Sequence, residues 1–502
     1  MSDIAALVAG NLDIWTSATQ RKSGAGRGGG KRISLYGIER LRALILDLAV
    51  RGKLVPQDAG DEPASELLKR IAKARRLKVD AGFARKPKTL DALPDQLAAL
   101  PIGWAWTQLG TIAEISPGNS SDDDVDVSFV PMALVSTSFA GDHEFETRKW
   151  GEVKKGFTHF AEGDIGLAKI TPCFENGKAA IFQNLQNGIG AGTTELHVAR
   201  PWSEELNRRY LLLTMKTGSY LANGEKRMTG TAGQKRVTRS YFEATPLPLP
   251  PLAEQRRIVA KVDELMALCD ALERESAEAM AAHQALVEEL LGLLVNSPDS
   301  SNLAANWARL ETHFDTLFTT DASIETLKQT ILDLAVRGKL VEQDAPDGGA
   351  SDLLKRIVAS NSKRVAAGDA KKMRSNSDTP SGPNPFDLPP NWVWTSLDRI
   401  AYKLTDGAHH TPTYTDEGVP FLSVKDMSSG SLDFSDTRFI SAEEHADLYR
   451  RCDPEKGDLL ITKVGTTGVP VIVDTDQQFS LFVSVALVKA PWELVSVEYL
   501  RA

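Results

Sequence analysis

One loop in the first half of the chain carries the side-chain types that contact nucleic acid. It runs from Met228 to Arg239 and has the sequence M-T-G-T-A-G-Q-K-R-V-T-R. Lysine and arginine suit phosphate, the glutamine can pair bidentately with adenine in the major groove, and glycine lets the backbone approach closely. A similar mixture occurs from Lys169 to Lys178, and its counterpart later in the chain is the segment Lys463 to Gly468. Each loop alone fits a plain turn better, so the rest of the chain must decide between the two interpretations.

No convincing catalytic or cofactor motif accompanies these loops. Gly24 to Gly29 satisfies the pattern G-x-G-x-x-G, but no apolar strand precedes it, so a flexible basic linker is the better interpretation. The chain contains neither a Walker A loop nor the D/N-P-P-Y/F tetrapeptide of amino-methyltransferases. His409 and His410 are adjacent, and adjacent histidines on a loop are usually not metal ligands. Acidic runs such as Asp122 to Asp124 fit solvent loops. We therefore expect no catalytic centre, cofactor or metal in this chain.

Length and composition indicate a multidomain globular protein. The 502 residues suggest about three domains, and 42% of them are hydrophobic and 25% charged. No apolar run is long enough to span a membrane, and Met1 to Gly10 lacks the features of a secretory signal. Cys173, Cys269 and Cys452 lie far apart without a metal-binding spacing, which predicts buried thiols in a reducing cytoplasm.

The net charge of -9 argues mildly against nucleic acid, but the charge is unevenly distributed. Residues 252–295 hold nine acidic and four basic side chains, whereas residues 69–88 hold nine basic and one acidic. Residues 223–242 hold five basic and one acidic. The net charge of the whole chain therefore neither supports nor excludes nucleic-acid binding.

The chain is a tandem duplication. The eleven residues from Ile45 to Val55 recur without change from Ile331 to Val341, 286 positions later. Two further segments repeat nearly in register, A-S-E-L-L-K-R-I at 64–71 and L-P-I-G-W-A-W-T at 100–107. Beyond the paired tryptophans the copies diverge to fragments such as Gly163-Asp164 against Gly457-Asp458. Two nearly identical repeated regions thus accompany globular regions of different sequence. This pattern predicts that the repeated regions bind two copies of one partner and that the two globular regions bind two different targets.

The second copy is incomplete. Tyr210-Leu211 aligns with Tyr499-Leu500, and residues 212–295 have no second counterpart. We expect either a fragment or a truncated gene.

Helical periodicity predicts the elements that hold the loops. Residues 252–294 are expected to form one long helix with an unbroken heptad seam. A core helix ending at Gly52 and its repeat at 323–337 follow the same pattern, and we expect the repeat to fold back on the long helix as an antiparallel pair. A basic helix is predicted from Ala64 to Val79. The predicted seam consists of Ile258, Val262, Leu265, Cys269, Leu272, Ser276, Ala279, His283, Leu286, Leu290 and Leu293.

The expected fold class is α+β, because residues 101–250 mix short apolar runs with Gly and Pro turns and residues 389–502 begin a second such body. Residues 17–32 and 359–387 are predicted to be polar linkers. The predicted regions are a helical region with a basic linker at 1–100, a globular domain at 101–250, a helical coiled-coil spacer at 251–358, a linker at 359–387 and a second globular domain at 388–502.

At this point the sequence closely resembles the specificity subunits of type I restriction-modification enzymes. The resemblance covers nearly the whole chain after residue 33. It is carried by the repeated L-D-L-A-V-R-G-K-L-V, L-P-x-x-W-x-W-T, G-D-I-G-L-A-K-I-T-P at 163–172, T-G-T-A-G-Q-K-R-V at 229–237, P-L-P-P-L-A-E-Q-R-R-I-V at 248–259, T-D-G-A-H-H-T-P-T-Y at 405–414 and F-L-S-V-K-D at 421–426.

The resemblance implies two target-recognition domains joined by long antiparallel coiled-coil helices in a pseudo-twofold repeat, each recognising half of a bipartite double-stranded DNA site. It implies two modification subunits that methylate adenine with S-adenosylmethionine, and restriction subunits that use ATP and Mg and cut DNA. The chain itself would be a non-catalytic, cytoplasmic subunit without a cofactor or membrane contact. The family's distal helix, which should pair with residues 252–294, has no counterpart here.

The candidate DNA-binding residues come from the loops and from the segments carrying the resemblance. They are Lys169, Thr171, Asn176, Lys178, Lys226, Arg227, Gln234, Lys235, Arg236, Arg239, His409, His410, Lys425, Lys463, Thr466 and Thr467. Three alternatives stay open: a specificity module of another phage-defence methylase system, an enzyme acting on DNA directly, and a coiled-coil scaffold without DNA recognition.

Overall fold

The structure, a computed structural model, describes residues 10, 12–18, 20–22, 32–231, 233–344, 348–370 and 384–502. The chain divides into two compact units, residues 1–280 and 281–502, which we describe separately. Helices and sheets are mixed in each, so the fold class is α+β as predicted. Within the described ranges no helix is both long and apolar enough to cross a membrane.

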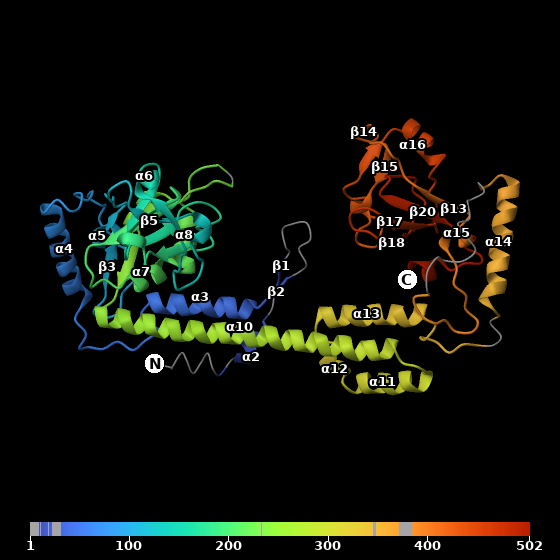
Figure 1. Ribbon diagram of the computed structural model, residues 1–502, viewed down its shortest axis with the longest axis horizontal. Coiled ribbons are helices and arrows are strands. Elements are labelled where there is room, and N and C mark those ends of the chain that lie inside the picture. Colours follow the sequence, from blue (N-terminus) through green and yellow to red (C-terminus); the bar gives the residue numbers. More distant parts are fainter. Residues whose placement is uncertain are drawn as a thin grey trace. The chain divides into compact units, whose positions relative to one another are not determined.

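The helical frame of the first unit is built on α3 (Tyr36–Val50) and the first part of α10 (Leu252–Val295). Ile38, Leu41 and Ile45 of α3 share one hydrophobic core with Ile258 and Val262 of α10, and the two helices lie side by side in Figure 1. Charged groups reinforce the pair, since Arg42 Nη2 lies 2.6 Å from Asp270 Oδ1 and 2.7 Å from Glu273 Oε2. The predicted long helix and core helix are both confirmed.

The predicted continuous heptad seam of α10 is wrong in its second half. The seam is buried from Ile258 to Leu272, but Leu286 and Leu293 are exposed by 51% and 44%. The buried residues there are instead Val287, Leu291 and Leu294. The physical reason is that the two halves of the helix belong to different hydrophobic cores, so no single stripe has to continue along its length.

The first globular body, residues 105–249, packs two four-stranded sheets and a two-stranded ribbon. The first sheet has the order β6-β5-β10-β7, with β10 parallel to β5, and the second has the order β4-β11-β8-β9, all antiparallel. The strands are β3 (Ala105–Gln108), β4 (Ala113–Ile115), β5 (Asp126–Val130), β6 (Glu146–Lys149), β7 (Thr158–Ala161), β8 (Ile165–Ala168), β9 (Ala179–Ile181), β10 (Ile189–Gly192), β11 (Leu196–Pro201) and β12 (Pro246–Leu249), with β12 pairing with β3.

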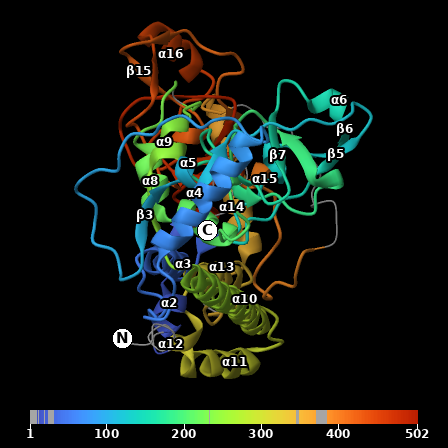
Figure 2. The same ribbon diagram turned by 90° about the vertical axis from the view of Figure 1, so that its left-hand side faces the viewer.

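Short helices cover this body, and α4 flanks it. α4 (Ala64–Asp80) buries Leu67 and Ile71, and it lies beside α5 in Figures 1 and 2. This confirms the predicted basic helix. The remaining helices of the first unit are α2 (Leu12–Ser17), α5 (Leu109–Ile112), α6 (Trp150–Val153), α7 (Arg208–Met215), α8 (Gly218–Glu225) and α9 (Arg239–Ala244).

The second unit also has a helical region beside a globular domain, and it contains additional helices between α10 and α13. The last turns of α10 share a core with α11 (Ser300–Thr312), α12 (Phe314–Leu317) and α13 (Asp321–Val336). Gln284 Nε2 donates to Thr326 Oγ1 at 3.2 Å, so α13 does contact the long helix as predicted. The other helices are α14 (Ala350–Ala367), α15 (Leu397–Ile400), α16 (Ala442–Tyr449) and α17 (Val497–Arg501).

One sheet of the second unit has the strand order of its counterpart in the first unit, whereas the other shares three strands with its counterpart and differs in its fourth, edge strand. The sheet β13-β20-β17-β18 corresponds to β4-β11-β8-β9, and in β14-β16-β15-β19 the strands β15 and β19 are parallel, as β5 and β10 are. The strands are β13 (Lys403–Asp406), β14 (Tyr414–Thr415), β15 (Val419–Leu422), β16 (Arg438–Ile440), β17 (Leu459–Thr462), β18 (Pro470–Ile472), β19 (Ser480–Leu481) and β20 (Val485–Lys489).

Both predicted linkers are wrong in part. Residues 17–32 include β1 (Gln20–Lys22), which pairs antiparallel with β2 (Arg32–Ser34), while the glycine-rich motif at 24–29 lies outside the described residues. The linker predicted at 359–387 begins as helix, because α14 continues to Ala367. Alanine, lysine and arginine favour that helix, and Gly368, with φ +85°, ends it in the left-handed conformation.

Candidate nucleic-acid interface

The structure brings the two candidate loops of the first domain together. Residues 229–236 form a hairpin in which the amide of Arg236 donates to the carbonyl of Thr229 at 2.8 Å and the reverse bond measures 3.0 Å. The other loop joins it through backbone bonds. The amide of Thr171 donates to the carbonyl of Lys235 at 2.9 Å, and that of Val237 donates to the carbonyl of Lys169 at 2.8 Å. Loops separated by about sixty residues in the sequence thus form one surface.

Glycine permits the tight turn of this hairpin. Gly230 has a φ of +119°, and a Cβ there would lie 2.9 Å from the carbonyl oxygen of Gln234. The turn projects Gln234 and Lys235 outward, where both are exposed and have no side-chain partner among the described residues. An amide and an ammonium are therefore available to a ligand at the tip of the hairpin.

Arg236 has a different environment from its neighbours. Its Nε lies 2.9 Å from Glu195 Oε2 and its Nη2 lies 2.8 Å from Glu195 Oε1, while Nη1 donates to the carbonyl of Gln234 at 3.1 Å. The arginine holds the pKa of Glu195 below its usual value, so the carboxylate stays ionised. A guanidinium engaged on all three nitrogens positions the hairpin, and the sequence pattern contained no signal for its partner.

Buried polar groups support the loops from beneath. His197 Nε2 lies 3.0 Å from the carbonyl of Val237, and burial lowers the pKa of this histidine. Lys216 donates to the carbonyl of Gly177 at 2.8 Å, and burial lowers its pKa to about 8. Neither residue was predicted, because nothing in the sequence distinguishes a buried supporting histidine or lysine from one on the surface.

The other candidates of the first domain divide between exposed groups and structural ones. Lys178 donates to the carbonyl of Met132 at 2.8 Å, and Thr171 donates to Glu175 Oε1 at 3.1 Å. Arg239 Nε lies 2.8 Å from Glu243 Oε2 at the start of α9. Asn176, Lys226 and Arg227 are exposed, with Arg227 placed 5.6 Å from the ring centre of Tyr241.

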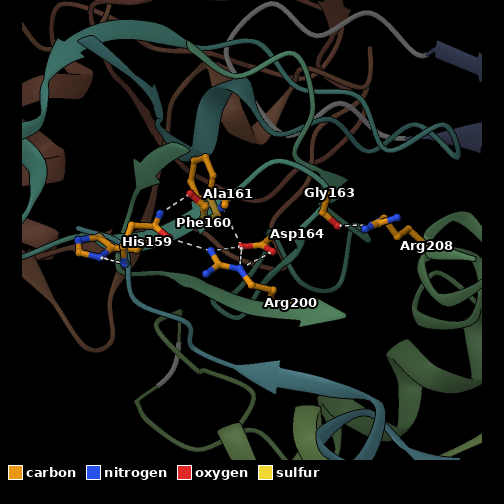
Figure 3. Close-up of polar contacts among 8 residues, drawn as sticks. His159, Phe160, Ala161, Gly163, Asp164, Arg200 and Arg208 are labelled. Carbon is orange, nitrogen blue, oxygen red and sulfur yellow. Dashed lines mark hydrogen bonds and ion pairs between the residues drawn. The ribbon is translucent and has the colours of Figure 1, made fainter. Parts of the chain in front are cut away.

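An ion pair between the partly buried Arg200 and the buried Asp164 fixes the strands that carry the Lys169 loop (Figure 3). Arg200 of β11 binds Asp164 with Nε–Oδ1 and Nη2–Oδ2 distances of 3.0 and 2.8 Å. Arg200 Nη2 also donates to Asn119 Oδ1 at 2.8 Å, and Asn119 donates to the carbonyl of Phe160 at 2.6 Å. Phe160 and Arg200 lie in different sheets, so this network ties the two sheets together.

The Gly-Asp fragment repeated in the sequence has the same structural role in both domains. The amide of Ala161 donates to Asp164 Oδ2 at 2.7 Å, and the amide of Glu455 donates to Asp458 Oδ2 at 2.8 Å. Both aspartates are buried, and Asp458 is paired with Lys489 Nζ at 2.9 Å. The strands β8 and β17 follow these turns, and the candidate lysines Lys169 and Lys463 follow the strands. The predicted correspondence of the two loops therefore has a structural basis.

In the second domain Asp406 gathers two predicted residues. His409 Nε2 lies 2.9 Å from Asp406 Oδ1, and Lys463 Nζ contacts Oδ2. Arg451, which was not predicted, also contacts Oδ1. Burial alone would raise the pKa of Asp406, but its bonds to Lys463 and His409 hold it below the usual value. The result is an exposed cluster in which one carboxylate contacts Lys463, Arg451 and the ring of His409.

The other candidate DNA-binding residues of the second domain lie outside the cluster formed around Asp406. Thr466 and Thr467 are exposed in the turn after Lys463. His410 points to Glu444 Oε1 at 3.7 Å, and Lys425 is paired with Asp436 Oδ2 at 3.1 Å. The Lys463 turn does approach the Lys425 segment, since a Cβ on Gly465 would lie 3.9 Å from Val424.

Comparisons with known proteins identify relatives of this chain. Residues 101–280 match the family model described as the type I restriction modification DNA specificity domain. The chain is 52% identical over 445 residues to the type I restriction enzyme EcoAI specificity subunit of Escherichia coli, covering 88% of this chain and 76% of that one. It is 48% identical to the EcoEI specificity subunit of the same organism, covering 93% of this chain and 80% of the relative. A chain from a solved structure of a type I R-M system is 18% identical over 81% of each chain, with a TM-score of 0.45.

Proposed function

Because the chain belongs to the specificity subunits of type I restriction enzymes, we propose that it recognises an asymmetric, two-part DNA site and has no catalytic activity of its own. The two globular domains, predicted at 101–250 and 388–502, would each recognise one half of the site. The observation that carries this proposal is that the sheet β4-β11-β8-β9 recurs as β13-β20-β17-β18, while the loops that follow β8 and β17 differ in their polar residues. A shared scaffold gives the same geometry to both domains, whereas unlike loops select unlike base sequences.

The helical frame is proposed to be a pseudo-twofold, antiparallel coiled-coil spacer that holds the domains at a fixed separation. Within the first unit α3 packs on α10, and within the second unit α13 packs on the last turns of α10. The repeated segments Ile45–Val55 and Ile331–Val341 offer equivalent surfaces to two modification subunits. Restriction subunits would join the same assembly. S-adenosylmethionine, ATP and Mg are proposed to be bound by these partners and not by this chain.

The proposal is tested by selection from a random duplex library with the chain in complex with its modification subunits. We expect two short specific elements separated by a spacer of fixed length and random sequence. Enrichment of one continuous element, or of no element, would refute the two-part recognition. The same selection with modification subunits alone is the control.

A further inference from the structure

A basic groove lies beside the recognition loops of the first domain, and it contains residues outside the predicted site. It consists of two adjoining hollows of about 560 and 260 Å³ that share Lys86, Pro87, Lys88, Leu90 and Gly110. The larger hollow is bordered by the end of α4, with Arg75 and Arg76. The smaller is bordered by β4 and by Arg239, the first residue of α9. In Figure 2 α4 lies on the face turned to the viewer.

Positive charge predominates in this groove although the chain as a whole has a net charge of -9. The lining residues include six cations and four carboxylates. Two of the cations are paired, Arg76 with Asp80 at 3.5 Å and Arg239 with Glu243 at 2.8 Å. Among the described residues no ion pair is formed by the other four, which are Arg75, Arg85, Lys86 and Lys88.

The groove is continuous with the recognition surface through Arg239. This residue ends the loop from Met228 and also lines the smaller hollow. The amide of Val237, two residues before Arg239, donates to the carbonyl of Lys169 at 2.8 Å, so the backbone of Lys169 lies beside the end of that loop. Lys169 and Arg239 thus belong to one loop surface, and Arg239 lines the same hollow as Lys86 and Lys88.

We propose that the basic groove binds the phosphodiester backbone of the DNA strand that continues beyond the bases contacted by the Met228–Arg239 loop. This inference rests on the proposed function. Two hollows in series, lined by unpaired ammonium and guanidinium groups, suit successive phosphates of a polymer. An acidic protein surface is the competing ligand, and the continuity with the recognition loop favours DNA. Phosphate contacts here position the duplex without selecting its sequence.

The test compares Lys86→Ala/Lys88→Ala with Lys73→Ala, which removes an exposed, unpaired lysine of α4 outside the groove. Binding of the full chain with its modification subunits is measured on the selected target and on unrelated duplex at several salt concentrations. We expect the double variant to weaken both complexes alike and to reduce the slope of log K against log salt by about 2. The control should keep the wild-type slope. Lys88→Glu should weaken binding more than the double variant, and thermal unfolding checks that each variant is folded.

The outcomes separate this inference from the proposed function. If wild type prefers its target and the groove variants behave like Lys73→Ala, the groove does not bind DNA and the inference is wrong. If the variants bind DNA normally but lose the modification subunits, the groove docks a protein and the inference is again wrong. If the wild-type complex shows no preference for any duplex, the proposed function is wrong, and the inference that rests on it is wrong as well.

Discussion

The indole nitrogen of Trp104 donates a hydrogen bond to Oε2 of Glu254 over 2.9 Å and so joins the start of the first globular domain to the first turn of α10. The other oxygen of Glu254 accepts from Gln57 Nε2 at 3.2 Å, and the same amide donates to the carbonyl of Gly52 at 2.9 Å. Three segments far apart in the sequence therefore meet at one buried carboxylate. In the second unit Trp392 Nε1 donates instead to Gln343 Oε1 at 3.0 Å.

Glu254→Gln should destabilise the first unit. Glutamine keeps one acceptor but places an NH₂ group against one of two fixed donors, which leaves a buried donor unsatisfied at a cost of about 1–3 kcal/mol. Chemical denaturation of the chain measures the change. Glu278→Gln, at an exposed position of the same helix, is the matched control and should have a negligible effect.

The same variant has a signature in the pH dependence of stability. Burial raises the pKa of Glu254 above 4.5 despite its bonds to Gln57 and Trp104. The folded state therefore binds more protons than the unfolded state just above pH 4.5, and this group's contribution to stability falls as pH rises through that window. Glu254→Gln should remove that part of the profile. An unchanged pH profile would show that the carboxyl is not the titrating group.

Gln234 and Lys235 should have separable effects on DNA binding. Lys235→Ala should weaken all sequences alike and reduce the salt slope by about 1, because an ammonium contacts phosphate. Gln234→Ala should cost roughly 1–3 kcal/mol at one base pair of the first half-site and leave non-specific binding nearly unchanged. Competition binding with single-base target variants distinguishes the two. If neither substitution changes affinity or specificity, the loop from Lys169 to Lys178 becomes the candidate reader.

Asp406→Asn should release the cation cluster of the second domain. Loss of the carboxylate frees Lys463 and Arg451, so non-specific DNA affinity should rise and its salt dependence should steepen. Discrimination in the second half-site should fall, because the cations lose their fixed positions. Asp447→Asn, which frees Arg450 on the surface of α16, is the control. An Asp406→Asn chain with wild-type discrimination would exclude the cluster from base recognition.

The sequence predicted where the helices lie better than it predicted which residues contact one another. The long helix was expected at 252–294 and spans Leu252–Val295, because its periodicity and flanking prolines act locally. Its seam failed beyond Leu272, because which face is buried depends on the neighbouring elements and not on the helix itself. The candidate loops were found from their composition. Glu195 and Asp406 hold the cations of those loops, and neither was selected as a candidate. Glu195 lies outside the quoted motifs, and Asp406, although it lies in the motif at 405–414, is brought to Lys463 only by the fold.

The purified chain should neither methylate nor cleave DNA, with or without S-adenosylmethionine, ATP and Mg. The expectation follows from the lack of a recognisable cofactor-binding motif in the sequence. Incorporation of labelled methyl groups and loss of supercoiled plasmid are the two assays. Turnover that co-purifies with the chain and survives removal of trace partners would contradict a purely recognising role.

The central claim is that this chain selects the DNA sequence that its partners modify, and methylome sequencing of cells with and without its gene tests it most directly. The modification subunits are kept at the same level in both strains, and the gene is restored from a plasmid as a control. We predict methylated adenines at one asymmetric, two-part motif that disappear without the gene and return with the plasmid. A methylation pattern that is the same in both strains would contradict the account.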